Sequence, residues 1–311
     1  MSKTAFIFPG QGAQYIGMGK ELFENIEVCK NIFNIADKEL NFKLSKLCFE
    51  GIESELNITE NTQPAILTTS IAALMALREC GIKCDVTAGL SLGEYSALVC
   101  SGAMDFRDAV KLVKKRGRFM QEAVPEGIGT MAAILGLDAN LVKVACSEAR
   151  TSGIVEIANL NCPGQIVIAG EIAAVELACT LAKEKGAKRA MLLSVSAPFH
   201  TSMLKPAAEK LEMELRNISF KEFNIPVMTN VNGDYVKSRE DIKDNLKLQV
   251  MSSVLWETTI RNMIKDGVDT FVEIGPGKVL SGFVKKIDRK LTVVNVEDLA
   301  SLNKAIEHLK S

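Results

Sequence analysis

The segment Gly89-Leu90-Ser91-Leu92-Gly93-Glu94 contains a serine between two glycines at the spacing Gly-x-Ser-x-Gly. After a strand and before a helix, this spacing is typical of a nucleophile elbow, a tight turn that leaves the serine oxygen exposed. The backbone N–H of Leu92 would lie at the N-terminus of the helix, where donors favour a developing oxyanion. The motif predicts that Ser91 carries an acyl group as a covalent ester, in an acyltransferase or an esterase.

A serine hydroxyl needs a base near neutral pH, and the chain has two histidines. His200 lies where a strand is expected to end and a helix to begin, at the rim of an α/β sheet where active sites gather. His308 lies in the last predicted helix, and we expect it to face solvent. His200 is therefore the predicted base. Without the elbow, packing or capping at a helix start would explain this residue about equally well.

Strands and helices are expected to alternate around these residues. In the first 125 residues, apolar periodicity predicts strands at 4–8 and 85–90 and helices at 20–40, 63–80, 92–101 and 106–122. This alternation is typical of a parallel α/β layer, which would carry the site at the carboxyl ends of its strands.

Between residues 129 and 194 the expected order changes to β-α-β-β-α-β, which is ferredoxin-like. Its strands are expected at 130–135, 155–159, 165–169 and 189–193, and its helices at 139–150 and 173–185. A strand at 270–274 and helices at 279–287 and 299–309 return to the first pattern. We expect residues 1–127 and 196–311 to form one large domain, into which residues 128–195 are inserted as a small subdomain.

The composition is that of a globular protein, with 47% hydrophobic and 24% charged residues. A formal net charge of -1 gives no general attraction for nucleic acid. No apolar stretch approaches the roughly 20 residues of a membrane span, and no signal peptide is visible. Eight cysteines without a Cys-x-x-Cys pair do not indicate a zinc site. We predict a cytoplasmic protein without metal, nucleic acid or membrane as partner.

Three other interpretations are open at this stage. The elbow spacing also occurs by chance as a glycine-capped strand–helix turn. A serine esterase could use Ser91 with His308 and an aspartate, although no aspartate follows a clear late strand. Gly10-Gln11-Gly12 after the first strand could form a nucleotide-binding loop, but Tyr15 stands where the third glycine belongs.

Six motifs, weak alone and specific in combination, follow one another along nearly the whole chain. They are Phe8-Pro9-Gly10-Gln11-Gly12, Gly89-Leu90-Ser91-Leu92-Gly93-Glu94, Arg116-Gly117 followed by Met120-Gln121, Asn161-Cys162-Pro163-Gly164-Gln165, Phe199-His200, and Glu273-Ile274-Gly275-Pro276-Gly277. In this order they resemble the malonyl-CoA:acyl carrier protein transacylases of fatty-acid synthesis, whose acyltransferase relatives occur in polyketide synthases. The resemblance implies an α/β fold, with a large α/β hydrolase-like domain around a parallel sheet and an inserted ferredoxin-like subdomain.

By position, the resemblance implies that Ser91 is the nucleophile and His200 the base. Backbone N–H groups of Gln11 and Leu92 would form the oxyanion hole. The main-chain carbonyl of Gln249 would orient the histidine, so that a dyad is expected rather than a triad.

Arg116 would bind the free carboxylate of a malonyl group, because a guanidinium pairs with both carboxylate oxygens. Without the resemblance, Arg116 would be assigned to a solvated basic helix face. Asn161 would line the pocket, and Phe199 would disfavour a branched methylmalonyl group. The family usually has a histidine where this chain has Leu90, which leaves the packing and polarity beside the serine open.

The implied reaction transfers malonyl from malonyl-CoA to the phosphopantetheine thiol of acyl carrier protein by ping-pong chemistry, without a cofactor. A serine esterase or thioesterase, or a trans-acting acyltransferase of polyketide synthesis, is the alternative. Acyl carrier proteins are acidic, so basic clusters are candidate docking sites, although each could equally be a solvated face. These clusters are Lys183, Lys185, Lys188 and Arg189, or Lys285, Lys286, Arg289 and Lys290. We expect a monomer.

Overall fold

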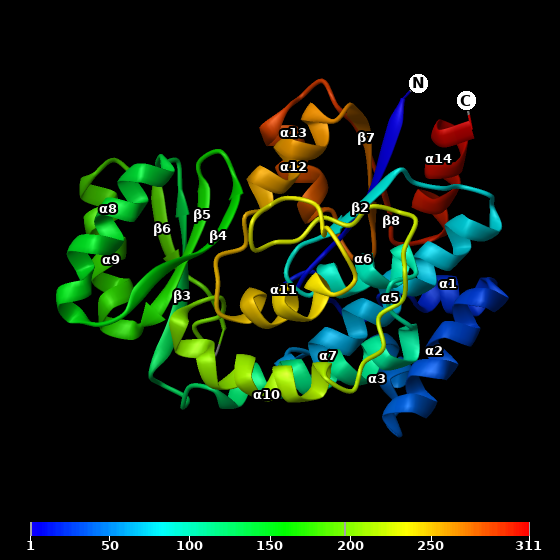
Figure 1. The fold of residues 1–311 in the computed structure, drawn as a ribbon, viewed down its shortest axis with the longest axis horizontal. Coiled ribbons are helices and arrows are strands. Elements are labelled where there is room, and N and C mark those ends of the chain that lie inside the picture. Colours follow the sequence, from blue (N-terminus) through cyan, green and yellow to red (C-terminus); the bar gives the residue numbers. More distant parts are fainter. Residues whose placement is uncertain (1, 196, 311) are drawn as a thin grey trace.

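A parallel sheet forms the centre of the computed structural model, which describes residues 2–195 and 197–310 (Figure 1). Its strand order is β2-β1-β7-β8, formed by β1 (Lys3–Phe8), β2 (Val86–Gly89), β7 (Val268–Ile274) and β8 (Thr292–Val296). All three neighbouring pairs are parallel. The predicted parallel layer is confirmed, with β8 as an edge strand that the sequence pattern does not indicate.

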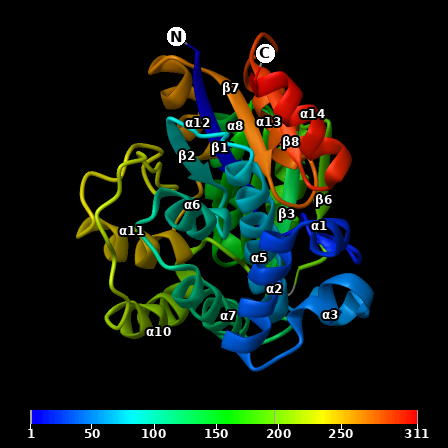
Figure 2. The same ribbon diagram turned by 90° about the vertical axis from the view of Figure 1, so that its right-hand side faces the viewer.

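The central strand β1 is buried on both faces. Its successive side chains alternate between the two sides of the sheet, and each side packs into a different cluster. Phe6 and Phe8 belong to a cluster built with α2 (Glu27–Leu40), α5 (Thr59–Glu79) and α7 (Phe106–Glu122). Ala5 and Ile7 belong to a second cluster, built with α12 (Trp256–Lys265) and α13 (Val279–Ile287). Figure 2 shows α2, α5 and α7 together, below the strands in that view. The sheet is thus covered by helices on both sides.

The helix predicted over residues 20–40 is two helices, α1 (Lys20–Asn25) and α2. Ile26 between them has an extended backbone, with φ of -127°, and its side chain packs on the core. The remaining helices of the large unit are α3 (Leu44–Glu50), α4 (Glu53–Leu56), α6 (Gly93–Ser101), α10 (Lys205–Leu215), α11 (Asp241–Val250) and α14 (Leu299–Lys310), with a short 3-10 turn η2 (Ser202–Leu204).

A second, antiparallel sheet has the order β4-β5-β3-β6 and lies to the left in Figure 1. It is formed by β3 (Gly129–Leu135), β4 (Val155–Cys162), β5 (Gln165–Glu171) and β6 (Arg189–Leu192), with α8 (Ala139–Ala149), the 3-10 turn η1 (Arg150–Ser152) and α9 (Ile172–Glu184). The predicted ferredoxin-like order is confirmed. Val254 joins the sheet to the large unit, because its N–H donates to Ala158 and its carbonyl accepts from Leu160.

Candidate active site

Ser91 occupies the turn between β2 and α6, at the carboxyl edge of the parallel sheet. Its φ of 52° is a left-handed conformation that residues other than glycine adopt rarely. A Cβ on Gly89 would lie 1.9 Å from the carbonyl carbon of Gly93, and a Cβ on Gly93 would lie 2.1 Å from the carbonyl oxygen of Phe8. Only glycine fits at these two positions, so the backbone has the close approach that the elbow motif predicts.

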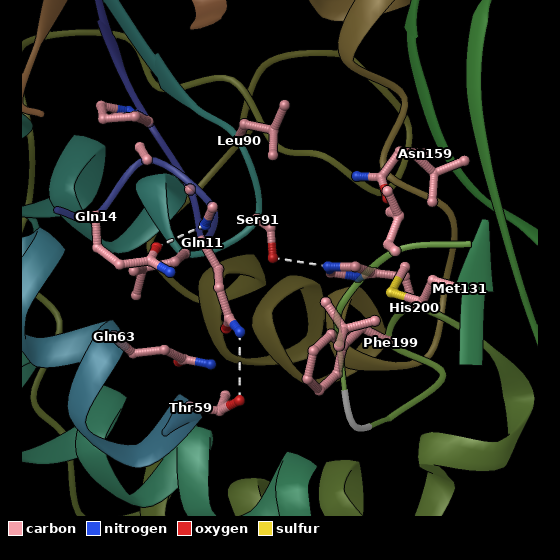
Figure 3. A pocket seen from close by; sticks show the side chains of 18 of the residues that line it. Gln11, Gln14, Thr59, Gln63, Leu90, Ser91, Met131, Asn159, Phe199 and His200 are labelled. Atoms are coloured by element: carbon pink, nitrogen blue, oxygen red, sulfur yellow. Dashed lines mark hydrogen bonds between the residues drawn. The ribbon is translucent and has the colours of Figure 1, made fainter. Parts of the chain in front are cut away.

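His200 faces Ser91 across a cavity (Figure 3), and its Nε2 lies 2.7 Å from Ser91 Oγ. On the other side of the ring, Nδ1 lies 2.8 Å from the main-chain oxygen of Gln249. A carbonyl only accepts hydrogen bonds, so Nδ1 carries the proton and the neutral ring presents the Nε2 lone pair to the serine. Burial, and secondly the charge of Arg116, lower the pKa of His200 from 6.5 to about 4. The imidazole is therefore neutral near pH 7, the form that a general base needs.

Two backbone N–H groups are available for an oxyanion beside Ser91. The N–H of Ser91 itself is not, because it donates to Asn230 Oδ1 at 2.6 Å. Those of Gln11 and Leu92 have no acceptor among the residues that the structure describes, and both residues line the cavity. The Gln11 side chain points away from Ser91 and toward Thr59, and Nε2 of Gln11 donates to the Thr59 hydroxyl at 3.3 Å (Figure 3).

Arg116 is only 1% exposed, so the solvated helix face is the wrong description of this residue. Its Nη1 donates to Gln63 Oε1 at 2.8 Å, and its Nη2 donates to Gln249 Oε1 at 2.9 Å and to Ser91 Oγ at 3.2 Å. All of these partners are neutral, and Nε has no hydrogen-bond partner among the described residues. A buried cation with neutral partners, beside a nucleophile, is suited to receive an anionic group of a substrate.

The cavity has a volume of about 770 Å³. It is lined by residues around the parallel sheet and by residues of the antiparallel sheet, such as Met131 and Asn161. Asn161 of β4 is 7% exposed, and its Oδ1 has no donor within the described part of the chain. Phe199 and Met131 contribute apolar surface next to His200 (Figure 3). Leu90 also lines the cavity and packs on the apolar cluster that contains Phe283. A leucine therefore fits its apolar surroundings beside the serine.

Three residues of this site escaped the sequence analysis. Gln63 and Asn230 contact Arg116 and the N–H of Ser91, respectively. Glu94 is buried behind the elbow, where its Oε2 accepts from the N–H of Asn230 and from Nε2 of Gln249. Glu94 belongs to the elbow motif and is the only charged residue of α6, which is the one signal that could have drawn attention to it.

The geometry does not support the esterase alternative in which His308 is the base. His308 is exposed on α14 and does not line the cavity, whereas His200 contacts the serine. Within residues 2–195 and 197–310, no cluster of His, Cys, Asp or Glu is arranged to hold a metal ion, and no helix is long and apolar enough to cross a membrane.

Known proteins are similar to this chain in sequence and in structure. Residues 5–307 match the model of the acyl transferase domain family. Malonyl CoA-acyl carrier protein transacylase of Bacillus subtilis is 55% identical over 311 residues, which cover 100% of this chain and 98% of the relative. The crystal structure of the protein of that name from Clostridium perfringens is 54% identical, with a TM-score of 0.96, over 99% of this chain and 98% of its own.

A further solved structure holds a type II PKS acyl-carrier protein in complex with its malonyl-transacylase. It is 44% identical to this chain, with a TM-score of 0.97, and covers 99% of this chain and 100% of its own. Since the family model and the relatives both extend over nearly the whole length, the chain belongs to the acyl transferase domain family.

Proposed function

We propose that this protein transfers malonyl from malonyl-CoA to the phosphopantetheine thiol of acyl carrier protein, through a malonyl ester on Ser91, and so supplies fatty-acid synthesis. The observation that carries the proposal is the contact of Ser91 Oγ with both the neutral base His200, at 2.7 Å, and the buried cation Arg116, at 3.2 Å. An acyl group with a free carboxylate would meet a counter-ion directly beside the atom that it acylates.

In the first half-reaction, Nε2 of His200 takes the proton of Ser91 as Oγ attacks the thioester carbonyl carbon. The oxyanion accepts hydrogen bonds from the N–H groups of Gln11 and Leu92. When the tetrahedral intermediate collapses, the C–S bond breaks, and the imidazolium returns its proton to the leaving thiolate of coenzyme A. Gln249 stabilises the imidazolium through its carbonyl dipole, without adding a charge.

In the second half-reaction, the phosphopantetheine thiol gives its proton to His200, and its sulfur attacks the malonyl ester. Collapse of the second intermediate breaks the bond to Ser91 Oγ, which regains a proton from His200. Ser91 and His200 thus return to their starting protonation states, and the proposed reaction uses no cofactor.

Arg116 would hold the malonyl carboxylate through both half-reactions. Asn161 would accept a hydrogen bond from the substrate, since its Oδ1 is otherwise unpartnered among the described residues. Phe199 would limit the width of the pocket beside the acyl group, which favours malonyl over methylmalonyl.

We further propose that residues 128–195 form a small subdomain inserted into a large one of residues 1–127 and 196–311, and that the protein acts as a monomer in the cytoplasm. Both basic clusters are candidate docking sites for an acidic carrier protein, because both border the cavity: β6 continues into Leu193, and α13, which carries Lys285 and Lys286, contributes Phe283. Lys185 is paired with Glu148, Lys286 with Gln165 and Lys285 with a main-chain carbonyl, whereas Arg189 is exposed and offers the sharper test. Charge reversal at Arg189 should raise KM for carrier protein and leave KM for malonyl-CoA unchanged.

Incubation with malonyl-CoA labelled in the acyl group tests the central proposal. The wild-type protein should retain one label per chain on Ser91 and should pass it to purified holo carrier protein. A Ser91→Ala protein that still acquired label would refute the assignment. Release of malonate to water at the rate of acylation, without transfer, would favour a thioesterase.

A further inference from the structure

Glu94 lies in the first turn of α6, three residues after the nucleophile, and only 1% of its surface is exposed. Its Oε2 accepts the main-chain N–H of Asn230 at 3.0 Å and the Nε2 amide of Gln249 at 2.7 Å. Asn230 in turn accepts the N–H of Ser91 through Oδ1 and donates to the carbonyl of Gly89 through Nδ2. One carboxyl oxygen is therefore bonded to both residues that support the elbow from behind.

Gln249 connects Glu94 to every reacting group. Its Nε2 also donates to the main-chain oxygen of Ser91 at 3.0 Å, and its Oε1 accepts from Arg116 Nη2 at 2.9 Å. Its main-chain carbonyl accepts from His200 Nδ1. This one residue, near the end of α11, thus orients the imidazole through its main chain and, together with Gln63, the guanidinium through its side chain.

The two ends of the Gln249 amide are distinguished only by their partners. The carboxyl Oε2 of Glu94 accepts hydrogen bonds, whereas the guanidinium of Arg116 only donates them. A flipped amide would place oxygen against oxygen at Glu94 and N–H against N–H at Arg116. Glu94 and the main-chain oxygen of Ser91 on one side and Arg116 on the other therefore permit a single orientation of the amide, and this orientation leaves Oε1 facing Arg116.

This arrangement does not depend on ionisation of the acid. Burial raises the pKa of Glu94 to about 7, and its bonds to Asn230 and Gln249 oppose that rise. Both bonds end on Oε2, so a proton on the carboxyl group would lie on Oε1 and would leave both in place.

We propose that Glu94 is a positioning residue that, by holding the side-chain amide of Gln249, sets the Arg116 guanidinium for the substrate carboxylate. The inference rests on the proposed function, because it takes Arg116 as the group that receives this carboxylate. It differs from a role in folding alone, since loss of Glu94 would affect an anionic acyl group more than a neutral one.

The experiment compares kcat/KM for malonyl-CoA and for acetyl-CoA, with holo carrier protein as acceptor, in purified full-length variants. Glu94→Ala removes the acceptor. Glu94→Gln keeps an amide oxygen, which would turn toward the backbone N–H of Asn230. Gln249→Met removes the side-chain amide but keeps the main-chain carbonyl that holds His200. Glu122→Ala, on an exposed acid of the Arg116 helix, is the matched control. The fraction of reactive Ser91 is counted with a neutral fluorophosphonate, so that unfolded protein does not enter the rates.

We expect Glu94→Ala to lower the malonyl-over-acetyl preference by about tenfold or more, the effect of one charge-assisted hydrogen bond. Glu94→Gln should restore the preference to within about threefold of wild type, because an amide oxygen still accepts the bond. Gln249→Met should reproduce the loss, and the double variant Glu94→Ala/Gln249→Met should lose no more than either single one, as residues of one network do.

Equal losses for both acyl groups in Glu94→Ala, or additive losses in the double variant, would overturn the positioning role. Failure of the proposed function would look different, since the wild-type protein itself would show no preference for malonyl, or Arg116→Ala would leave that preference intact.

Discussion

Replacement of Arg116 by alanine tests how the site selects its acyl group. In the free protein, Nε of Arg116 has no partner among the described residues, and Nη2 donates a hydrogen bond to Ser91 Oγ. Acylation turns Oγ into an ester oxygen, which is a weaker acceptor, so this Nη2 donor is released. At least two donors of a buried guanidinium are then available to the substrate carboxylate. Bonds to charged groups contribute about 1.5–3 kcal/mol each, so two of them contribute about 3–6 kcal/mol.

This energy corresponds to a loss of roughly 10²–10⁴-fold in kcat/KM for malonyl-CoA. Acetyl-CoA offers no carboxylate, so its transfer should fall by less than about tenfold, through the loosened Gln249 alone. The assay follows transfer of labelled acyl groups from coenzyme A to holo carrier protein. Arg118→Ala is the control, because Arg118 lies on the same helix with a half-exposed side chain. Equal losses for the two substrates would refute the argument that Arg116 binds the carboxylate.

Three further predictions concern the base and the pocket. His200→Ala should slow acylation of Ser91 by about 10³-fold or more, whereas His308→Ala should leave it unchanged. Because the pKa of His200 is lowered to about 4, the neutral base is lost only as pH falls toward that value. The acylation rate, measured by rapid quenching, should be flat from about pH 6 to 8. Phe199→Ala should reduce the preference for malonyl over methylmalonyl by about 10-fold or more, the effect of admitting one methyl group.

Different results would contradict each of these predictions. Inactivation by His308→Ala alone would restore the hydrolase interpretation. A midpoint near pH 6.5 in the acylation rate that persists in Glu94→Gln would contradict the lowered pKa of His200. An unchanged preference in Phe199→Ala would place the restriction elsewhere on the cavity wall, for example at Met131.

Local rules predict the part of the site that lies within a few residues of chain. Gly89, Ser91 and Gly93 form an elbow because their spacing alone decides which backbone the turn can adopt. Most strands of the two sheets likewise follow from short apolar runs, whereas the edge strand β8 does not. Ile26 shows where such rules fail, because periodicity continues through it while tertiary packing holds its backbone extended.

The residues alone could not predict partners that are distant in sequence, and Gln249 was assigned to the site only through the resemblance to a family. Asn230 and Gln249 lie 139 and 158 positions from the serine whose backbone they bind. They belong to segments with no motif and no strong periodicity, and only the folded chain brings them together. Arg116 is intermediate, since its sequence neighbours suggest an exposed basic face, and the resemblance to a family was needed to assign it to the pocket.

The left-handed backbone at Ser91 is repeated at His200, where φ is 63°. Each such conformation costs a residue with a Cβ roughly 1–2 kcal/mol, whereas glycine adopts it freely. Backbone preference alone would therefore let mutation drift toward glycine at both positions. Selection for catalysis must act continuously against that drift. At these two positions the backbone conformation favours glycine, whereas the chemistry requires serine and histidine. Relatives that have lost the activity should show glycine or asparagine at these two positions first.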